Sequence, residues 1–491
     1  MHKAILINKS DSVAVALQEL KKGDMALNTK LLSNVPFGHK FAVHDIKKGS
    51  SVIKYGFVIG EATDDIKAGS HVDTHNLKTK LEYVAEYEYN KENPERTEKP
   101  KERHFFGYER QNKTVGIRNE IFIVPTVGCV NNTAEIIAKK ANERFPDLCD
   151  GFFAFPHPYG CSQLGKDGEN TASFLAAVCR HPNAGGVLLL GLGCENNNIS
   201  VMEKHLSGAD KSRIRFLITQ NESDEVETAL TKIQELCENA VKDKRTKQPL
   251  SKLVVGMKCG GSDAFSGITA NPLCGFVSDY ITALGGSVIL TEVPEMFGAE
   301  TQLFNRCENE DVFKGAVSLI NNFKCYFLEH GEPIYENPSP GNREGGITTL
   351  EEKSLGCIQK GGKSIVTDVL PLYGRCKKGG LSLLYGPGND IVSSANLAAS
   401  GANIILFTTG RGTPLGTFVP TIKISSNTIL AKRKPNWIDF DAGKVLKDTD
   451  FLSSRDELIN LIIEIANGEK RTQNEKNGYR DIAIFKSGVT L

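Results

Sequence analysis

The stretch GGVLLLGLGCENN, residues 185–197, decides the fold class of this chain. It begins with a continuous apolar run, the composition of a strand that is buried on both faces of a parallel sheet. Glycine, cysteine, glutamate and asparagine follow that run directly. Ligands of open α/β sheets bind beyond the carboxyl ends of the strands, so the stretch also predicts binding chemistry at its polar end.

The same pattern recurs along most of the chain. Further apolar, β-branched runs occupy residues 121–127, 151–155, 213–219, 253–259, 287–293, 364–370, 381–387 and 403–409. Helical patterns separate several of these runs, for example at residues 132–145 and 224–241. Alternation of strands and helices predicts largely parallel α/β sheets that are covered on both faces.

The N-terminal part has a different rhythm. Residues 51–72 show short β-prone runs that Gly and Asp interrupt, which is typical of a compact β barrel or clip. Residues 86–104 are rich in charge, contain two prolines and indicate a linker. A second polar stretch lies at residues 242–252. We therefore expect a small β-rich domain at 1–85, a linker at 86–104, and α/β domains at 105–248 and 249–491.

Composition narrows the function classes. The 491 residues contain 59 Lys and Arg against 59 Asp and Glu, so a nucleic-acid partner is not expected. The longest apolar runs are far shorter than the roughly 20 residues that cross a membrane. The first residues do not form a secretory signal, so we expect a cytoplasmic protein. Its twelve cysteines would then be thiols or metal ligands rather than disulfides.

Five of the twelve cysteines have an unusual setting. Four follow directly on a β run, and all five stand beside or near glycine; they are Cys129, Cys161, Cys194, Cys259 and Cys357. Thiolate, imidazole and carboxylate groups together suit Fe²⁺, Zn²⁺ or Mn²⁺. One reading is a single ion held by some of His157, Cys161, Cys194, Cys259 and Glu292. The alternative is an iron–sulfur cluster bound by three dispersed cysteines.

Three further sequence patterns are candidates for binding sites. In the N-terminal module, His39, Lys54, His71 and His75 either converge as a lid over the main site or belong to solvated loops. The stretch GCIQKGGKS, residues 356–364, resembles a phosphate loop, but its glycine spacing is wrong and a strand-like run follows it. Since no GxGxxG motif follows a strand either, a nucleotide cofactor is not expected.

Several longer sequence motifs resemble those of a known protein family. They are PTVGCVN (125–131), YGCSQLG (159–165), GLGCENN (191–197), CGGSDAFSGITANP (259–272), TEVPEMFGAE (291–300) and TGRGTP (409–414). Together they resemble the altronate/galactarate dehydratase family, and the likeness runs from the first residues to Leu491. The resemblance implies an N-terminal SAF (β-clip) domain and a homodimer. One departure is Asp73, which stands where the family pattern has histidine.

The resemblance also implies an activity. It is a lyase that removes water from D-altronate to give 2-dehydro-3-deoxy-D-gluconate, in hexuronate (galacturonate) catabolism. It depends on Fe²⁺, with Mn²⁺ as a substitute. Two alternatives stay open: a sibling lyase acting on galactarate or a sulfonated hydroxy acid, and a sugar-acid-binding protein without catalysis.

Roles for individual residues follow from that chemistry. A metal would be held by His157, Cys161, Cys194, Cys259 and Glu292. The substrate would be bound by Asn131, Asn196, Asn197, Ser262, Asp390 and Arg411, with Arg411 gripping its carboxylate. The general acid and base would come from Lys353, Asp263, His39 and His75. By motif, Glu295 also matches the family pattern.

Overall fold

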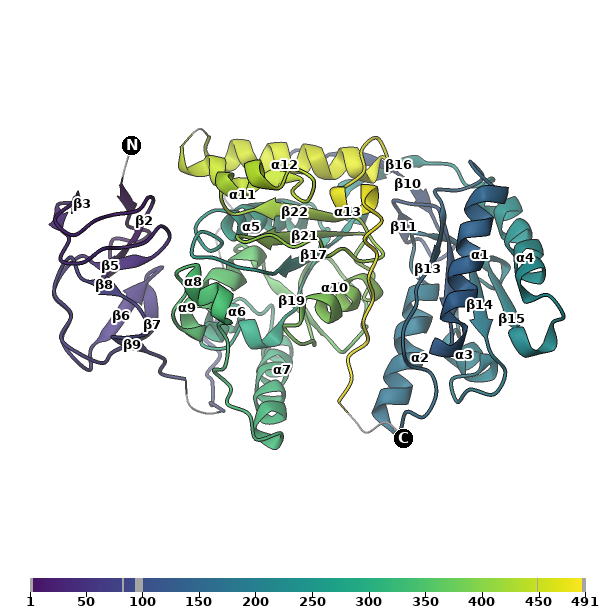
Figure 1. Ribbon diagram of the computed structural model, residues 1–491, viewed down its shortest axis with the longest axis horizontal. Coiled ribbons are helices and arrows are strands. Elements are labelled where there is room, and N and C mark those ends of the chain that lie inside the picture. Colours follow the sequence, from purple (N-terminus) through teal and green to yellow (C-terminus); the bar gives the residue numbers. More distant parts are fainter. Residues whose placement is uncertain (1–2, 82–83, 93–99, 448, 488–491) are drawn as a thin grey trace.

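The computed structural model describes residues 3–81, 84–92, 100–447 and 449–487. It places an N-terminal β domain at one end, a large α/β domain in the middle and a smaller α/β domain at the other end (Figure 1). The predicted fold class, a β-clip domain followed by largely parallel α/β segments, is confirmed. Part of the predicted linker, residues 93–99, lies outside the described residues.

The N-terminal domain consists of short antiparallel strands, and no helix is assigned within residues 3–81. One sheet has the order β1 (Ala4–Ile5), β2 (Val13–Ala16), β5 (Lys40–Ala42) and β8 (His71–Val72). A second has the order β6 (Ser51–Lys54), β7 (Phe57–Ala62) and β9 (Leu77–Lys78), and β3 (Met25–Ala26) pairs with β4 (Thr29–Lys30). Frequent turns leave each strand too short to bury much surface alone, so the sheets pack against each other.

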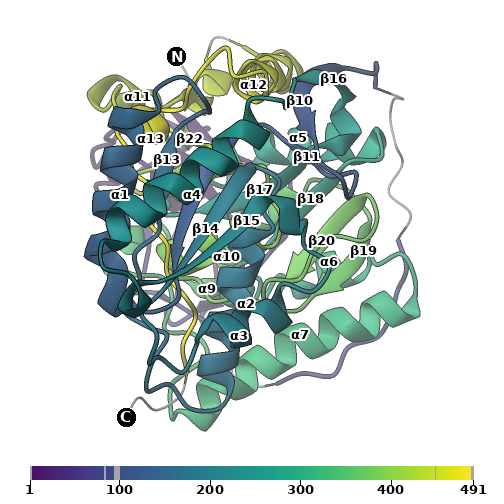
Figure 2. The ribbon, with the colours of Figure 1, turned by 90° about the vertical axis from the view of Figure 1, so that its right-hand side faces the viewer.

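The smaller α/β domain is built on one parallel sheet. Its strands lie in the order β13 (Phe152–Ala154), β12 (Glu120–Pro125), β14 (Ala184–Gly191) and β15 (Ile214–Ile218). Helices α1 (Asn131–Arg144) and α4 (Glu225–Ala240) cover its outer face, as Figure 2 shows. The other face carries α2 (Lys166–Cys179), and α3 (Ile199–His205) packs beside α2.

The middle domain contains a seven-stranded parallel sheet. Its order is β19 (Val366–Leu370), β20 (Gly380–Leu384), β18 (Ser287–Leu290), β17 (Val254–Cys259), β21 (Ile404–Thr409), β22 (Thr421–Ser425) and β23 (Phe440–Asp441). Its longer helices are α5 (Ala270–Ala283), α7 (Glu310–Glu329), α9 (Leu350–Cys357), α10 (Asp390–Ala399) and α12 (Phe451–Ala466). Its shorter ones are α6 (Glu300–Phe304), α8 (Pro340–Glu344), α11 (Thr428–Arg433) and α13 (Gln473–Lys476).

Sequence runs and observed elements agree closely for the long segments. The helices expected at 132–145 and 224–241 are α1 and α4. Asp224 caps the N-terminus of helix α4, since its side chain accepts a hydrogen bond from Glu227 N, and the buried positions of the helix follow the helical period. Strand β22 was not predicted from the sequence. Its residues, TIKIS, have a lysine between two isoleucines, so they do not form a continuous apolar run.

A third small sheet joins the two α/β domains. Strand β10 (His104–Glu109) pairs with β11 (Val115–Gly116) and with β16 (Thr246–Pro249), antiparallel in both cases. Residues 242–252, which the sequence marks as a polar stretch, therefore contain a strand. The chain enters and leaves the smaller α/β domain through neighbouring strands. The expected domain boundaries at 85, 104 and 248 stay predictions.

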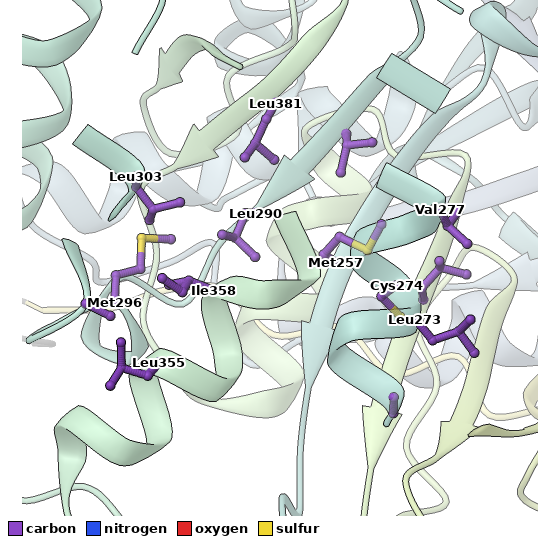
Figure 3. Close-up of a cluster of buried hydrophobic side chains, with 14 of the residues drawn as sticks. Met257, Leu273, Cys274, Val277, Leu290, Met296, Leu303, Leu355, Ile358 and Leu381 are labelled. Carbon is purple, nitrogen blue, oxygen red and sulfur yellow. The ribbon is translucent and has the colours of Figure 1, made fainter. Parts of the chain in front are cut away.

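Helices in the described part of the chain are too short or too polar to cross a membrane. The main apolar core lies on the faces of the middle sheet, and Figure 3 shows part of it. Met257 and Leu290 from the strands meet Met296, Leu355 and Ile358 from the segments that cover the sheet's carboxyl edge. This core fixes the position of that edge.

Candidate active site

Polar side chains gather where strands β17 and β18 end. Apolar core residues stand next to them in sequence: Met257 beside Lys258, Met296 beside Glu295, and Ile358 beside Cys357. The packing in Figure 3 anchors one residue of each pair in the core. The backbone near the polar partner is therefore held in place by its apolar neighbour, which is how an active site obtains fixed geometry.

The centre of this group is two thiols and a carboxylate. Cys259 Sγ lies 3.2 Å from Cys357 Sγ, and Glu295 Oε2 lies 3.0 Å and 2.8 Å from these two sulfurs. All three side chains are buried, and their donor atoms lie within 4.8 Å of one another. Two sulfurs and a carboxylate oxygen are a donor set that suits Fe²⁺ or Zn²⁺.

The two thiols share their protons unequally. The hydrogen bond from Cys357 lowers the pKa of Cys259 to about 6, against the opposing effect of burial. The same hydrogen bond, together with burial, raises the pKa of Cys357 well above its usual value. Near neutral pH one sulfur of the pair is thus a thiolate, the form that binds metals.

Three buried lysines surround the thiols and face three carboxylates. Lys258 pairs with Glu292 and, at 2.9 Å, with Asp390 Oδ1. Lys353 Nζ lies 2.8 Å from Glu295 Oε1, and Lys360 Nζ lies 3.7 Å from Glu292 Oε2. Burial lowers the pKa of Lys353, but the negative charges of Glu295, Cys259 and Cys357 together outweigh it and raise that pKa.

This balance of charge supports a divalent ion at the thiols. The three ammonium groups already compensate the three carboxylates. Deprotonation of both Cys259 and Cys357 would place a second buried thiolate beside the first, at a cost in free energy that the raised pKa of Cys357 reflects. A divalent cation would compensate both, so the residues present fit the metal that the family resemblance implies.

A cavity of about 550 Å³ opens onto this group. Cys259, Glu295 and Lys353 contribute to its wall, together with Ser262 and Asp390. Cavities of this size hold small organic ligands. The wall is rich in polar groups that suit the hydroxyl and carboxylate groups of a sugar acid.

Helix α8 and the residues before it complete the wall. Lys353 Nζ donates to Asn337 Oδ1 at 2.9 Å and to Asn342 Oδ1 at 3.1 Å. Asn342 Nδ2 in turn donates to the backbone oxygen of Ser262 at 2.8 Å. Ser339 caps α8 through a reciprocal capping box with Asn342. The segment is thus rigidly held, and it positions the Lys353 ammonium.

A second group with metal-binding donors lies in the N-terminal domain. His39 Nδ1 is 3.1 Å from His71 Nε2 and 3.4 Å from Asp73 Oδ2. Burial lowers the pKa of His71 to about 4, so its ring is neutral at physiological pH. His75 stacks beside His71 at 5.7 Å between ring centroids, outside the close group. Two imidazoles and a carboxylate are also a donor set for Fe²⁺.

The N-terminal domain is fixed to helix α9 by a buried charge triad. Lys40 Nζ and Lys54 Nζ lie 2.9 Å and 2.7 Å from the two carboxylate oxygens of Glu352. All three side chains are 1% exposed. Thr348 Oγ1 also donates to Asp73 Oδ1 at 3.1 Å. Residues 337–357 therefore contact the histidine group on one side and the thiol group on the other.

The structure brings together part of the predicted site and separates the rest. Cys259, Lys353, Ser262 and Asp390 line the cavity, and Glu292 is buried beside them against Lys258. His39 belongs to the N-terminal group, and His75 lies next to that group. Lys54, which the sequence placed with these histidines, is instead part of the charge triad.

Two predicted residues have structural partners outside the cavity wall. Asp263 is buried and accepts hydrogen bonds from Ser266, Ser426 and Asn427, so its carboxylate holds loops together. Arg411 is exposed and pairs with Glu344 at 2.9 Å.

The remaining predicted residues lie on the other sheet. Asn131, Asn196, Asn197, His157, Cys161 and Cys194 follow strands β12, β13 and β14. His157 Nε2 donates to Pro125 O at 2.8 Å, and its Nδ1 accepts from Tyr159 N at 3.2 Å. Both ring nitrogens are thus used by the backbone. The structure divides the predicted metal ligands between two sheets.

Sequence reasoning did not assign Lys258, Lys360 or Asn342 to the site. The signal for Lys258 was present, since a lysine directly before Cys259 ends a strand that is otherwise apolar. Cys357 was singled out for its glycine neighbour but was not placed with Cys259. It comes from a helix almost one hundred residues later in the chain, and sequence spacing gives no sign of their contact.

Comparisons with known proteins give a consistent family. Residues 2–80 match the altronate/galactarate dehydratase SAF domain, residues 107–241 the second domain of D-galactarate dehydratase/altronate hydrolase, and residues 250–490 the C-terminal domain of D-galactarate/altronate dehydratase. An altronate dehydratase of Bacillus subtilis is 50% identical over 100% of both chains. One of Escherichia coli is 49% identical over 99% of both. An Escherichia coli galactarate dehydratase (L-threo-forming) is 31% identical over 98% of this chain and 96% of its own.

Proposed function

This chain belongs to the altronate/galactarate dehydratase family, and we propose that it is a hydro-lyase that converts D-altronate to 2-dehydro-3-deoxy-D-gluconate and water. The observation that carries the proposal is the difference in identity between its relatives. Two altronate dehydratases are 50% and 49% identical to the whole chain, whereas the galactarate dehydratase is 31% identical. The reaction would belong to hexuronate catabolism.

Dehydration of a sugar acid requires three contributions from the site. The proton at C2 must be removed, although the adjacent carboxylate makes the resulting enediolate doubly negative. The hydroxyl at C3 must leave with a proton, and the enol that forms then ketonises. The site must therefore supply a base, an acid and a stabiliser of negative charge.

The divalent metal is proposed to be Fe²⁺, with Mn²⁺ as a substitute, held by Cys259, Glu295 and Cys357. A metal at this position polarises the oxygens of a bound carboxylate and stabilises negative charge. Lys258 and Lys360 pair with Glu292 beside these ligands.

Lys353 is proposed as the proton donor to the departing hydroxyl. Its ammonium group borders the cavity, and the negative charges of Glu295, Cys259 and Cys357 together raise its pKa and keep it protonated. Asp390 is proposed as the base at C2, because its carboxylate lies at the cavity and is 41% exposed there. The hydroxyl of Ser262 and the amide nitrogen of Asn337 line the cavity and are proposed to bind sugar hydroxyls.

Two further properties are proposals; the first rests on the family resemblance, and the second is the expectation drawn from the sequence. They are a homodimeric state and a cytoplasmic location. Light scattering of the purified protein tests the first, and fractionation of the cells that produce it tests the second.

The function is tested by anaerobic turnover of D-altronate with and without added Fe²⁺, following formation of the 2-keto-3-deoxy acid. Galactarate and sulfolactate are assayed in parallel. Iron-dependent product from altronate supports the proposal. Product from galactarate or sulfolactate alone moves the assignment to a sibling lyase. A folded protein that binds altronate but turns over none of the three acids is a binding protein.

A further inference from the structure

Three Gly–Cys pairs stand at the carboxyl edge of the smaller α/β domain. Gly128–Cys129 follows β12, Gly160–Cys161 follows β13, and Gly193–Cys194 follows β14. These strands are direct neighbours, with β12 in the centre. Since neighbouring strands lie about 4.8 Å apart and all three are parallel, their loops emerge side by side.

Hydrogen bonds tie the three loops to one another. Gly128 N donates to Tyr159 O at 2.9 Å, and Asn197 N donates to Gly160 O at 2.9 Å. Ser162 N donates to Asn196 Oδ1, also at 2.9 Å. Gly160 has φ +104°, and a Cβ atom there would lie 2.1 Å from the backbone oxygen of Thr126. Only glycine lets these loops approach so closely.

The polar side chains under the loops are used to hold the backbone. His157 bonds the backbone through both ring nitrogens. Glu195 accepts from Thr126 Oγ1 at 2.6 Å and from the backbone nitrogens of Leu192 and Gly193. The loops are therefore built as a rigid scaffold, and none of this polar network depends on the cysteines.

The three cysteines, by contrast, are exposed. Cys161 Sγ donates a hydrogen bond to Asn196 Oδ1 at 3.4 Å, and Cys194 Sγ accepts one from Gln220 Nε2 at 3.7 Å. Exposed thiols are a liability because they oxidise, and soluble proteins generally avoid them. Three of them on one rigid edge indicate a bound group that uses them.

We propose that Cys129, Cys161 and Cys194 bind an iron–sulfur cluster. Sulfurs bonded to one ion at about 2.3 Å each are at most about 4.6 Å apart. Within the described part of the chain, these three sulfurs do not form a group inside 4.8 Å. A cluster spreads its cysteine ligands over several irons, so it accepts the wider spacing.

Three ligands leave one iron of a four-iron cluster without a cysteine. The described residues of the three loops contain no fourth cysteine, and His157 has no free ring nitrogen. That iron would be free to take an oxygen ligand such as a hydroxyl or carboxylate. The cluster site is distinct from the group at Cys259, which lies on the other sheet.

The test is reconstitution of the full-length protein with iron and sulfide under anaerobic conditions. Iron and acid-labile sulfide are measured per chain, and the visible absorption is followed on reduction with dithionite. We expect about four irons and about four sulfides per chain from the cluster. The triple variant C129S/C161S/C194S should hold none of this sulfide.

Two control variants separate this site from the rest of the molecule. C325S changes a partly buried cysteine of α7 and should keep all of the sulfide. C259S changes the thiol group at the cavity and should also keep the sulfide, whether or not it turns over altronate. Absence of labile sulfide in the reconstituted protein overturns the proposal. So does its retention in a triple variant whose circular dichroism matches the parent.

Discussion

Glu352 and Lys353 are adjacent in helix α9, yet their side chains serve different parts of the molecule. Glu352 is buried against Lys40 and Lys54 of the N-terminal domain. Lys353 extends to Glu295, Asn337 and Asn342 at the cavity. One turn of helix therefore connects docking of the N-terminal domain to the position of the proposed proton donor.

Removal of the Glu352 charge should loosen this connection. In E352Q two buried ammonium groups lose their partner, and removing one side of a buried ion pair costs about 3–5 kcal/mol of unfolding free energy. We expect a lower Tm and a reduced kcat. The matched control is K67A, which breaks an exposed pair with Asp45 in the same domain and should leave both quantities unchanged.

The same residue predicts a pH dependence. Burial opposes ionisation of Glu352, but the charges of Lys40 and Lys54 outweigh it and lower its pKa from 4.5 to about 2. A lowered carboxyl pKa stabilises the folded protein above pH 4.5, and that contribution is lost as pH falls from 4.5 towards 2. At 1.36 kcal/mol per pKa unit, it amounts to about 3 kcal/mol.

Urea unfolding of the parent and of E352Q between pH 5 and pH 3 measures this contribution. The difference in unfolding free energy between them should shrink as the pH falls. An equal difference at every pH would contradict the prediction that the two lysines lower the pKa of Glu352.

Loss of the Lys353 ammonium should affect catalysis more than folding. General acid catalysis contributes about 10²–10⁴-fold to rate, so K353M should lower kcat by at least 100-fold. K353R keeps the charge and should retain more activity than K353M. K363A, which removes an exposed lysine ten residues later, is the control. A kcat for K353M within tenfold of the parent contradicts the assigned role.

Metal binding at the thiol group gives a fourth prediction. A chelator should abolish activity and Fe²⁺ should restore it in the parent. C259S and C357S should each hold less divalent metal by elemental analysis, because both sulfurs are ligands. The variant H71A tests the second group. If H71A loses the metal while C259S and C357S keep it, the catalytic ion belongs to the N-terminal histidines.

Oxidation should reversibly inactivate the enzyme. Cys259 Sγ and Cys357 Sγ are 3.2 Å apart. One peroxide molecule can convert the two thiols to a disulfide and two waters, and the thiolate of Cys259 is the attacking form. Activity lost to peroxide should return with dithiothreitol, and thiol titration should show two groups fewer. Because C357A cannot form this disulfide, thiol titration of that variant should not show the dithiothreitol-reversible loss of these two groups.

The fold class was readable from the sequence because apolar runs alternate with helical periods. Strands β14, β17 and β21 stand where the runs at 185–193, 253–259 and 403–409 predicted them. Cys259 and Glu292 lie at or just beyond strand ends, as their place in the sequence predicted, while their roles in the site stay predictions. Which sheet each strand joins was not, because local pattern carries no information on long-range pairing. The metal ligands predicted as one set consequently fall on two sheets.

Contacts made by helices were harder still to predict. Cys357 and Lys353 reach the cavity because α9 lies over the carboxyl ends of β17 and β18. That placement depends on the packing of Leu355 and Ile358 into the core, which a single sequence does not reveal. The partner of Lys54 was missed for the same reason, since Glu352 lies almost three hundred residues away.

The pairing of β10 with β16 bears on the order in which the protein is assembled. This short ladder, with His104 opposite Pro249, closes a loop of well over one hundred residues. Closing such a loop while it is still unfolded costs entropy that grows with its length. The cost falls once the enclosed domain has folded and brought its own ends together. During synthesis the smaller α/β domain would thus fold before β10 pairs with β16. The pairing would then fix the position at which the chain enters the middle domain.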